Sequence, residues 1–289
     1  MGYSARYHAT SLIAVFIALA IGILIGAEFG GETLTGTRKN LEQSLVGNLQ
    51  DARERADRLS AELGRSNEFG ERVYPVLVRH KLRGWRIGVV ALGGLPGDVS
   101  GGIEKALVAT GARLVAVGVV REPVDLGALA GDVAGAGFVH LARNPSTQEA
   151  FGAAIGRRLV RGGRLVELVR SQLFSRASGN FGALDGVIVV RDQPQGMGPL
   201  QRAAAARLEA ALVGGVTATH TPAVGVESTN AEPSSVPFFR ANVLPSVDDV
   251  DLVAGRLAMV FALRGAEGSF GVKGSADRLL PDLLAPLAK

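Results

Sequence analysis

The chain has 289 residues, a formal net charge of +4, 39 glycines and no cysteine, and 5% of its residues are aromatic. The lack of cysteine excludes disulfide bonds and thiolate metal sites. Acidic and basic residues are interspersed without a block of Lys and Arg, so we expect no nucleic-acid partner.

An uncharged, apolar run covers residues 9–27 (ATSLIAVFIALAIGILIGA). As a helix with a rise of about 1.5 Å per residue it would extend about 28 Å, close to the thickness of the hydrocarbon core of a bilayer. We predict an uncleaved transmembrane helix. A cleaved signal peptide and a buried core helix are the alternatives, but only Arg6 precedes the run and 26–29 (GAEF) is a poor cleavage site.

The residues that flank this run indicate its orientation. Arg6 precedes it, Glu28 and Glu32 follow it, and the next basic residues, Arg38 and Lys39, lie further out. The positive-inside rule counts basic residues close to the membrane, and the N-terminal segment is short, so we expect residues 1–8 in the cytoplasm and the large domain outside. Gly22 and Gly26 form a small-xxx-small pair that would let two such helices approach closely, although Gly is also simply common in membrane helices. We therefore expect a single-pass membrane protein of the cell envelope.

Residues 37–68 are rich in charge and contain no proline. Within them, apolar residues recur in steps of four and three, which is the seam pattern of a coiled coil. The seam residues are Leu45, Leu49, Ala52, Ala56, Leu59 and Leu63. We predict a coiled coil at 37–68 and, through it, a homo-oligomer, most simply a parallel dimer; a single helix that packs on its own domain is the alternative.

Short β-branched runs alternate with helical segments from residue 85 to residue 264. We predict buried strands at 86–92, 113–120, 187–191 and 223–227, and helices at 99–110, 147–161, 164–174, 199–213 and 248–263. Gly111 ends the first of these helices, Gly214-Gly215 end the fourth, and Ser246 or Asp248 caps the last. Residues 265–289 contain several Gly and Pro and are expected to form an irregular tail.

Strands that are apolar throughout and alternate with helices form a largely parallel sheet that is covered on both faces. We therefore predict an α/β fold in three parts. They are the N-terminal transmembrane helix, the short coiled coil, and a mostly parallel, Rossmann-like α/β domain over 85–264.

A glycine-rich loop, 93–98 (GGLPGD), lies between the first strand and its helix, where α/β folds bind phosphates. Its spacing is not G-x-G-x-x-G, no GK[ST] follows it, and Pro96 removes one donor. No acidic residue ends the second strand either. We expect a tight turn here rather than a nucleotide site.

Histidine and methionine are scattered along the chain: His8, His80, His140 and His220, and Met1, Met197 and Met259. No histidine is paired with another ligand at helical spacing, and the methionines are too sparse for a soft-ligand Cu(I) site. Metal-ligating residues therefore remain unknown from the sequence.

Two further groups favour structural interpretations. Asp248, Asp249 and Asp251 fall in the first turn of the predicted last helix, where the helix dipole favours carboxylates, and a hard-cation site is the alternative. Ser234-Ser235 precedes Pro237 as in an ordinary turn, and no G-x-S-x-G motif is present. We expect no catalytic residues, no cofactor and no enzyme activity.

Both ends of the chain carry recognisable motifs. Residues 7–22 (YHATSLIAVFIALAIG) with Gly26 form one, and 246–251 (SVDDVD), 254–256 (AGR), 270–272 (FGV) and 274–277 (GSAD) form the other. In these segments the chain resembles the actinobacterial copper transporter family of the MctB type. The resemblance implies a role in copper homeostasis at a membrane or outer envelope, with copper ions as partners. It transfers no set of metal ligands onto this chain.

Three hypotheses follow. The first is a membrane-anchored envelope protein in copper transport or copper homeostasis, as the resemblance implies. The second is a coiled-coil dimeric scaffold or interaction module without a metal role. The third is a small-ligand-binding α/β domain that uses the crevice at the carboxyl ends of the strands, around 93–98.

Overall fold

The computed structural model describes residues 4–193 and 196–283, with side chains for 10–27, 45–193 and 196–283. The chain divides into two compact units, Met1–Ser66 and Asn67–Lys289. The N-terminal unit consists of the greater part of one long helix, α1 (Ser4–Val78), whose last turns belong to the second unit.

The apolar run lies within α1. Among the described residues, Thr10–Ala27 is the one helical segment that is long and apolar enough to cross a membrane, with a mean hydropathy of 2.5. None of it is buried. A core helix of a soluble protein would be mostly buried, so this exposure disfavours the core-helix alternative. Length and composition are what support a membrane span.

The predicted seam also lies within α1, which confirms a helix there. Its leucines are all more than half exposed: Leu45, Leu49, Leu59 and Leu63. Pairing of two such helices stays a prediction.

The second unit is built on a seven-stranded sheet with the order β3-β2-β1-β4-β5-β6-β7. The strands are β1 (Arg86–Gly93), β2 (Arg113–Val120), β3 (Phe174–Gly179), β4 (Gly186–Asp192), β5 (Ala223–Val226), β6 (Ser246–Val247) and β7 (Ser269–Phe270). All neighbours pair in parallel except β3, which runs antiparallel to β2 at one edge. The mixed α/β fold with a mostly parallel sheet is therefore confirmed.

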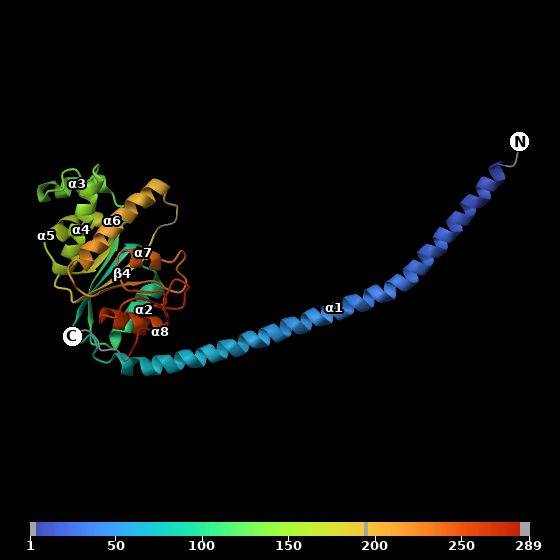
Figure 1. The fold of residues 1–289 in the computed structure, drawn as a ribbon, viewed down its shortest axis with the longest axis horizontal. Helices are drawn as coiled ribbons and strands as arrows, with labels where there is room; N and C mark the ends of the chain where they lie inside the picture. The colour runs from blue at the N-terminus through green and yellow to red at the C-terminus, as the bar shows by residue number, and fades with distance from the viewer. Residues whose placement is uncertain (1–3, 194–195, 284–289) are drawn as a thin grey trace. The chain divides into compact units, whose positions relative to one another are not determined.

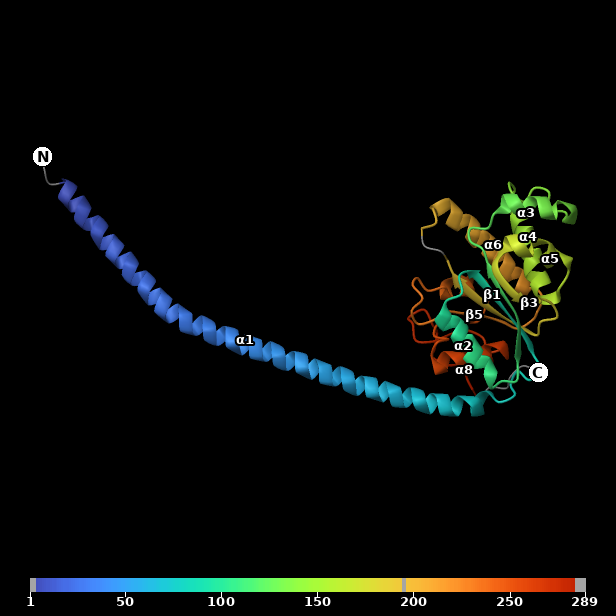
Figure 2. The same ribbon diagram turned by 180° about the vertical axis from the view of Figure 1, so that it is seen from behind.

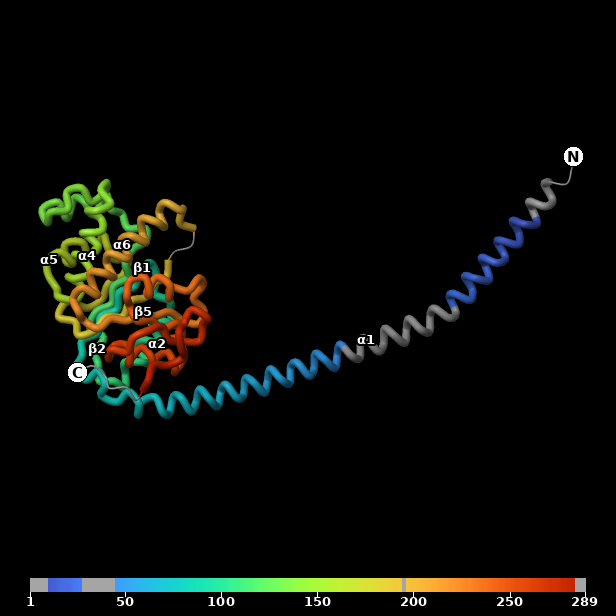
Figure 3. The backbone as a smooth tube through the Cα atoms, viewed as in Figure 1, coloured from blue at the N-terminus to red at the C-terminus, as the bar shows by residue number. Residues whose placement is uncertain are grey.

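Helices cover both faces of this sheet (Figures 1 and 2). They are α2 (Gly97–Val108), α3 (Leu126–Val133), the 3-10 turn η1 (Ala134–Ala136), α4 (Pro145–Arg161), α5 (Arg164–Leu173), α6 (Pro199–Thr217), α7 (Val236–Ala241) and α8 (Val253–Leu263). One hydrophobic core joins the sheet to α3, α4, α5 and α6, and the other joins it to α2, α8 and the end of α1. The backbone trace shows the segment after α8, in red, beside α7, in orange (Figure 3).

The last turns of α1 are part of the second core. Tyr74 and Val78 are buried, and the Tyr74 hydroxyl donates to the carbonyl of Ala106 on α2 at 2.7 Å. Glu71 pairs with the buried Arg256 of α8, and this contact lowers the pKa of Glu71 below its usual range. The end of α1 is thus held to α2 and α8 by packing, a hydrogen bond and an ion pair.

The order of the strands creates a switch point at β1. The chain leaves β1 for β2 on one side and later returns to β4 on the other. At such a point the flanking loops diverge, and a crevice opens at the carboxyl ends of the strands.

The four predicted strands are confirmed to within one residue at either end. The predictions missed β3, β6, β7, α3 and α7. Residue 174 begins β3 rather than ending a helix, and within the tail expected to be irregular Ser269–Phe270 forms β7.

Two predicted helix boundaries are wrong. The last helix begins at Val253 with Leu252 as its cap, so neither Ser246 nor Asp248 caps it. Helix α6 continues through Gly214-Gly215 to Thr217 because Gly215 packs against the backbone of α4: a Cβ there would clash with the carbonyl oxygen of Ala153. The glycine serves helix–helix contact rather than helix termination.

These adjacent glycines give a matched test of close packing. Gly215→Ala should lower the free energy of unfolding by about 1–3 kcal/mol because α4 must move away. Gly214→Ala, where a Cβ meets nothing within 4 Å, should raise it by up to about 1 kcal/mol by reducing the entropy of the unfolded chain. Urea unfolding of the full chain in detergent measures both, and equal effects would contradict the packing argument.

Candidate functional site

Charged residues gather at the carboxyl edge of the parallel strands. Glu122 follows β2, Arg191 and Asp192 end β4, Glu227 follows β5, and Asp248 follows β6. Ligands of α/β proteins bind at this edge. The charged residues form two clusters, one beside the switch point and the other around β5, β6 and β7.

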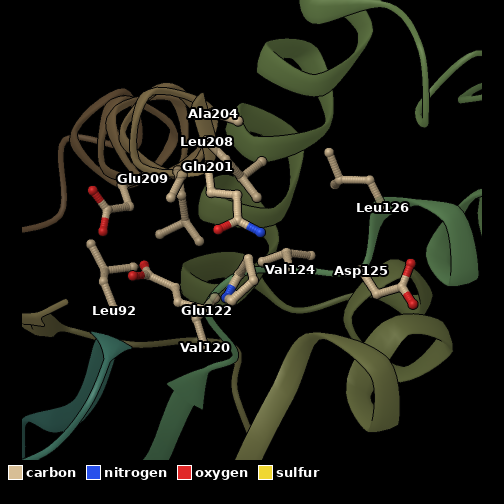
Figure 4. Close-up of a pocket in the computed structure, with 13 residues that line it drawn as sticks. Leu92, Val120, Glu122, Val124, Asp125, Leu126, Gln201, Ala204, Leu208 and Glu209 are labelled. Carbon is tan, nitrogen blue, oxygen red and sulfur yellow. The ribbon is translucent and has the colours of Figure 1, made fainter. Parts of the chain in front are cut away.

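The first cluster borders a pocket of about 450 Å³. The pocket lies between the carboxyl ends of β1 and β2, the segment that follows β2, and helix α6 (Figure 4). Its walls are mainly aliphatic: Leu92, Val120, Pro123, Val124, Leu126, Ala204, Ala205, Leu208 and Leu212. A volume of this size is typical of a small-molecule site.

Glu209 of α6 lies at one side of the pocket and is only 3% exposed. Its carboxylate accepts hydrogen bonds from Nε of Arg191 at 3.0 Å and from Nε2 of Gln193 at 3.1 Å. The Arg191 guanidinium also stacks over the ring of Phe238, 4.4 Å from its centroid. These contacts satisfy the charge of Glu209 and fix the guanidinium away from other ligands.

Glu122 behaves differently. Both of its carboxyl oxygens are buried, and neither accepts a hydrogen bond from any residue that the structure describes. In Figure 4 the carboxyls of Glu122 and Glu209 lie on the same side of the pocket, near Leu92. Burial, a side-chain hydrogen bond that the protonated carboxyl shares with Glu209, and the charge of Glu209 raise the pKa of Glu122 to about 9, so this carboxyl is protonated at neutral pH.

The glycine-rich loop takes no part in the pocket. It joins β1 to α2 as expected, and Pro96 precedes the first helical residue. A Cβ on Gly94 would meet the carboxylate of Asp192, so this carboxylate lies directly beside the loop. This carboxylate would repel a phosphate group at Gly94. The pocket lies at the carboxyl ends of the strands, as the third hypothesis expected. Leu92 and Glu122 line it, whereas residues 93–98 do not.

The second cluster is centred on Glu227, which is 1% exposed. Its carboxylate accepts from Nζ of Lys273 at 2.8 Å, from Oγ of Ser234 at 2.7 Å and from the backbone N–H of Ser235. Lys273 also donates to the carbonyl of Ala231 at 2.7 Å. Ser234 and Ser235 therefore orient the buried carboxylate of Glu227. The segment expected to be an ordinary turn is part of this hydrogen-bond network.

The three aspartates around 248–251 do not lie in the first turn of a helix, so the helix-dipole interpretation is wrong. Asp248 is buried and accepts from the backbone N–H groups of Val272, at 2.9 Å, and Lys273. Asp251 accepts from the N–H and the hydroxyl of Thr229, at 2.8 and 2.7 Å. Short polar side chains here bind the backbone of neighbouring loops, which takes them out of the helix pattern.

Asp249 is fully buried, and neither of its carboxyl oxygens accepts a hydrogen bond from the described residues. Burial and, to a lesser extent, the nearby carboxylates of Asp248 and Asp251 raise its pKa to about 7. Burial likewise raises the pKa of Asp248. The cluster thus holds an acid that titrates near neutrality.

The structure does not bring the scattered candidate ligands together. His80, His140 and His220 are exposed and lie in different loops, while the side chain of His8 and the whole of Met1 lie outside the described parts. Met197 and Met259 are buried in different segments. Among residues 10–27, 45–193 and 196–283, no group of three or more His, Asp or Glu side chains is arranged to hold a metal ion.

Sequence reasoning missed the pocket pair. Glu122 lies two residues beyond the end of the second strand, so a search for an acidic residue at the strand end passes over it. Glu209 lies within an alanine-rich helix and carries no motif. The available signal was the position of Glu122, directly after a buried strand beside the switch point.

Comparison with known proteins gives one consistent result. Residues 3–281 match a protein family described as "Copper transport outer membrane protein, MctB". The chain is 23% identical to proteins named copper transporter MctB from Mycobacterium bovis and Mycobacterium tuberculosis. Each alignment covers 90% of this chain and 91% of the relative.

The raised pKa of Asp249 predicts that the free energy of unfolding depends on pH. An unfolded Asp titrates near 3.8, whereas Asp249 titrates near 7 in the folded protein. Between these values the folded state binds more protons than the unfolded state, so the free energy of unfolding falls as the pH rises. Asp249→Asn should remove that part of the slope and make the protein more stable at pH 8 by on the order of 2 kcal/mol.

Urea unfolding of the full chain in detergent, at several pH values from 4 to 8, measures this slope. The groups that face Asp249 are Asp248, Asp251 and Lys273, and all remain in the variant. Asp132→Asn, which changes an exposed carboxyl on α3, is the control and should keep the slope of the parent protein. Identical slopes in Asp249→Asn and the parent would contradict the assignment.

Proposed function

The chain belongs to the family of copper transport outer membrane proteins typified by MctB, and we propose from that premise that it acts in copper transport or copper homeostasis as a membrane-anchored protein of the cell envelope. The observation that carries the proposal is the family match over residues 3–281, which includes the apolar helix and the α/β domain together. The names of the mycobacterial relatives agree with it.

The apolar helix and its flanking charges support the proposed topology. Thr10–Ala27 crosses the membrane once, residues 1–8 remain in the cytoplasm, and the α/β domain lies outside the cytoplasm. We propose no catalytic role, because the family is one of transport proteins by its description.

The residues of the chain constrain how copper is handled. A single spanning helix cannot enclose a pore, so a channel would require several copies or a partner. Cu(I) prefers thiolate and thioether ligands, and this chain has no cysteine and only three methionines. The copper role therefore fits an assembly in which this protein is one component.

A gene deletion tests the copper role. Loss of the gene in the organism that encodes it should change growth in graded copper several-fold, and should change cellular copper measured by mass spectrometry. The full gene should restore both values, whereas a gene that lacks codons 9–27 should not. Unchanged tolerance and unchanged copper content in the deletion strain would contradict the proposal.

The exposed leucines of α1 favour a second candidate, a dimeric scaffold or interaction module of the envelope. Leu45, Leu49, Leu59 and Leu63 are more than half exposed, and a parallel partner helix would bury them. Arg58 and Glu54 form an i,i+4 ion pair within the helix on the side away from this seam, so the charged residues leave the seam itself apolar. This candidate is compatible with a copper role.

The chain lacks cysteine, so single introduced cysteines give a clean test of pairing. Leu59→Cys, on the seam, should form disulfide-linked dimers in native membranes under mild oxidation because seam positions of a parallel dimer face each other. Glu54→Cys, on the opposite side, is the matched control and should cross-link several-fold less. Gel electrophoresis without reductant measures the dimer fraction, and equal cross-linking at both positions would contradict the coiled coil.

A further inference from the structure

We propose that the pocket between β1, β2 and α6 binds a small organic ammonium ion with an aliphatic body, and that Glu122 receives its charge. The inference concerns a ligand that the copper role does not involve and goes beyond that role. It stands on the shape of the pocket, on the pairing of its polar groups and on the signs of the surrounding charges.

The walls select the body of the ligand. Leucine, valine, proline and alanine side chains line most of the pocket, which gives no hydrogen-bonding partners for a polar molecule or a hydrated ion. An alkyl or alicyclic group of a few carbons gains roughly 0.8 kcal/mol per buried CH₂ on entering such a site. The body of the ligand is therefore aliphatic.

The polar groups of the pocket determine where the charged group of the ligand binds. Asp125 accepts from the N–H of Ala128 at 2.9 Å, and Gln201 accepts from the N–H of Gly198 at 3.1 Å, so both cap helices. Glu209 is occupied by Arg191 and Gln193. Among the carboxyls that line the pocket, this leaves Glu122, whose two oxygens have no donor in the described part of the chain.

The charges around the pocket determine the sign of the ligand's charge. The charged groups that act on Glu122 are Glu209, Asp192 and Arg191, and Arg191 is already engaged by Glu209. Glu209 and Asp192 would repel an anionic ligand, whereas they would attract an ammonium ion, which would also stabilise the ionised form of Glu122. A bare metal ion finds few ligands here, because among the described lining residues Asp125, Gln201 and Glu209 already accept hydrogen bonds, which leaves the carboxyl of Glu122.

Binding is coupled to a proton. In the empty pocket Glu122 is protonated at pH 7.5, since burial and Glu209 raise its pKa to about 9. When an ammonium group donates to its carboxylate, the carboxyl loses that proton to solvent, and the total charge in the pocket stays constant. The complex therefore forms with the release of about one proton for each ligand bound.

Isothermal titration of the full chain in nanodiscs of zwitterionic lipid, with n-hexylammonium as the probe, tests the proposal. Titration at pH 7.5 in two buffers of different ionisation enthalpy gives the number of protons released. We expect saturable binding with about one proton released. 1-Hexanol and hexanoate, which have the same body, should bind at least about tenfold more weakly because they lack the positive charge.

Variants locate the site. Glu122→Gln should weaken the binding of n-hexylammonium by at least about tenfold and abolish proton release. Ala204→Phe, which fills the pocket from α6, should abolish binding, whereas Ala203→Phe on the exposed side of the same helix should not. The Ala203→Phe chain also controls for partition of the probe into lipid and for any general effect of a large side chain on α6.

Several results would overturn the proposal. They are the absence of saturable binding to the parent chain, equal binding of 1-hexanol, and binding without proton release. Equal affinities in the Glu122→Gln variant, or binding that survives Ala204→Phe, would show that the probe binds elsewhere. Thermal unfolding of each variant shows whether it is folded, and a variant that is not folded is replaced by Glu122→Ala or Ala205→Phe.

Discussion

The second half of the sheet depends on carboxylates that accept hydrogen bonds from backbone N–H groups of other loops and strands. Strands β6 and β7 contain two residues each, so their ladder hydrogen bonds alone hold little of the chain. Asp248 binds the N–H groups that follow β7, and Asp277 binds the N–H of Ser269 at 2.9 Å. Hydrogen bonds to charged acceptors are stronger than those between neutral groups, which compensates for the short strands.

The same chemistry links loops that are far apart in sequence. Glu227 joins the segment before α7 to the C-terminal segment through Lys273, and Asp251 joins the loop after β6 to the loop after β5 through Thr229. Each buried carboxylate with its donors in place adds a specific constraint. Asp249 and Glu122 lack such donors and titrate near or above neutrality instead. Asp249 is enclosed by protein, and Glu122 lines a pocket.

Much of the fold could be predicted because its central strands are continuous β-branched runs. β1, β4 and β5 are buried along most of their length and β2 along its second half, and their continuous apolar sequences are visible without a structure. β3 (FSRASG) was missed because most of it is exposed, as befits an antiparallel edge strand, and β6 and β7 are too short for any periodicity. The end of α6 was misplaced because a glycine can permit close helix packing as readily as it can end a helix.

The candidate site was harder to predict than the fold. Glu122 and Glu209 meet only because β2 and α6 cross the same edge of the sheet, so no local spacing connects them. The aspartates 248–251 were visible as a group, but their role depends on which N–H groups fold against them. The resemblance to a copper transport family, by contrast, was readable from short motifs at both ends, and the family match confirms it.

The composition limits what the copper role can mean at the level of this chain. The chain has no cysteine, and Met259 of α8 is buried in the core, so neither offers a soft ligand for copper at the surface. The proposed copper role would then need ligands from further copies or from another protein. The exposed leucines of α1 are the surface through which the proposed self-association would bring further copies together, so the scaffold and copper hypotheses depend on the same helix.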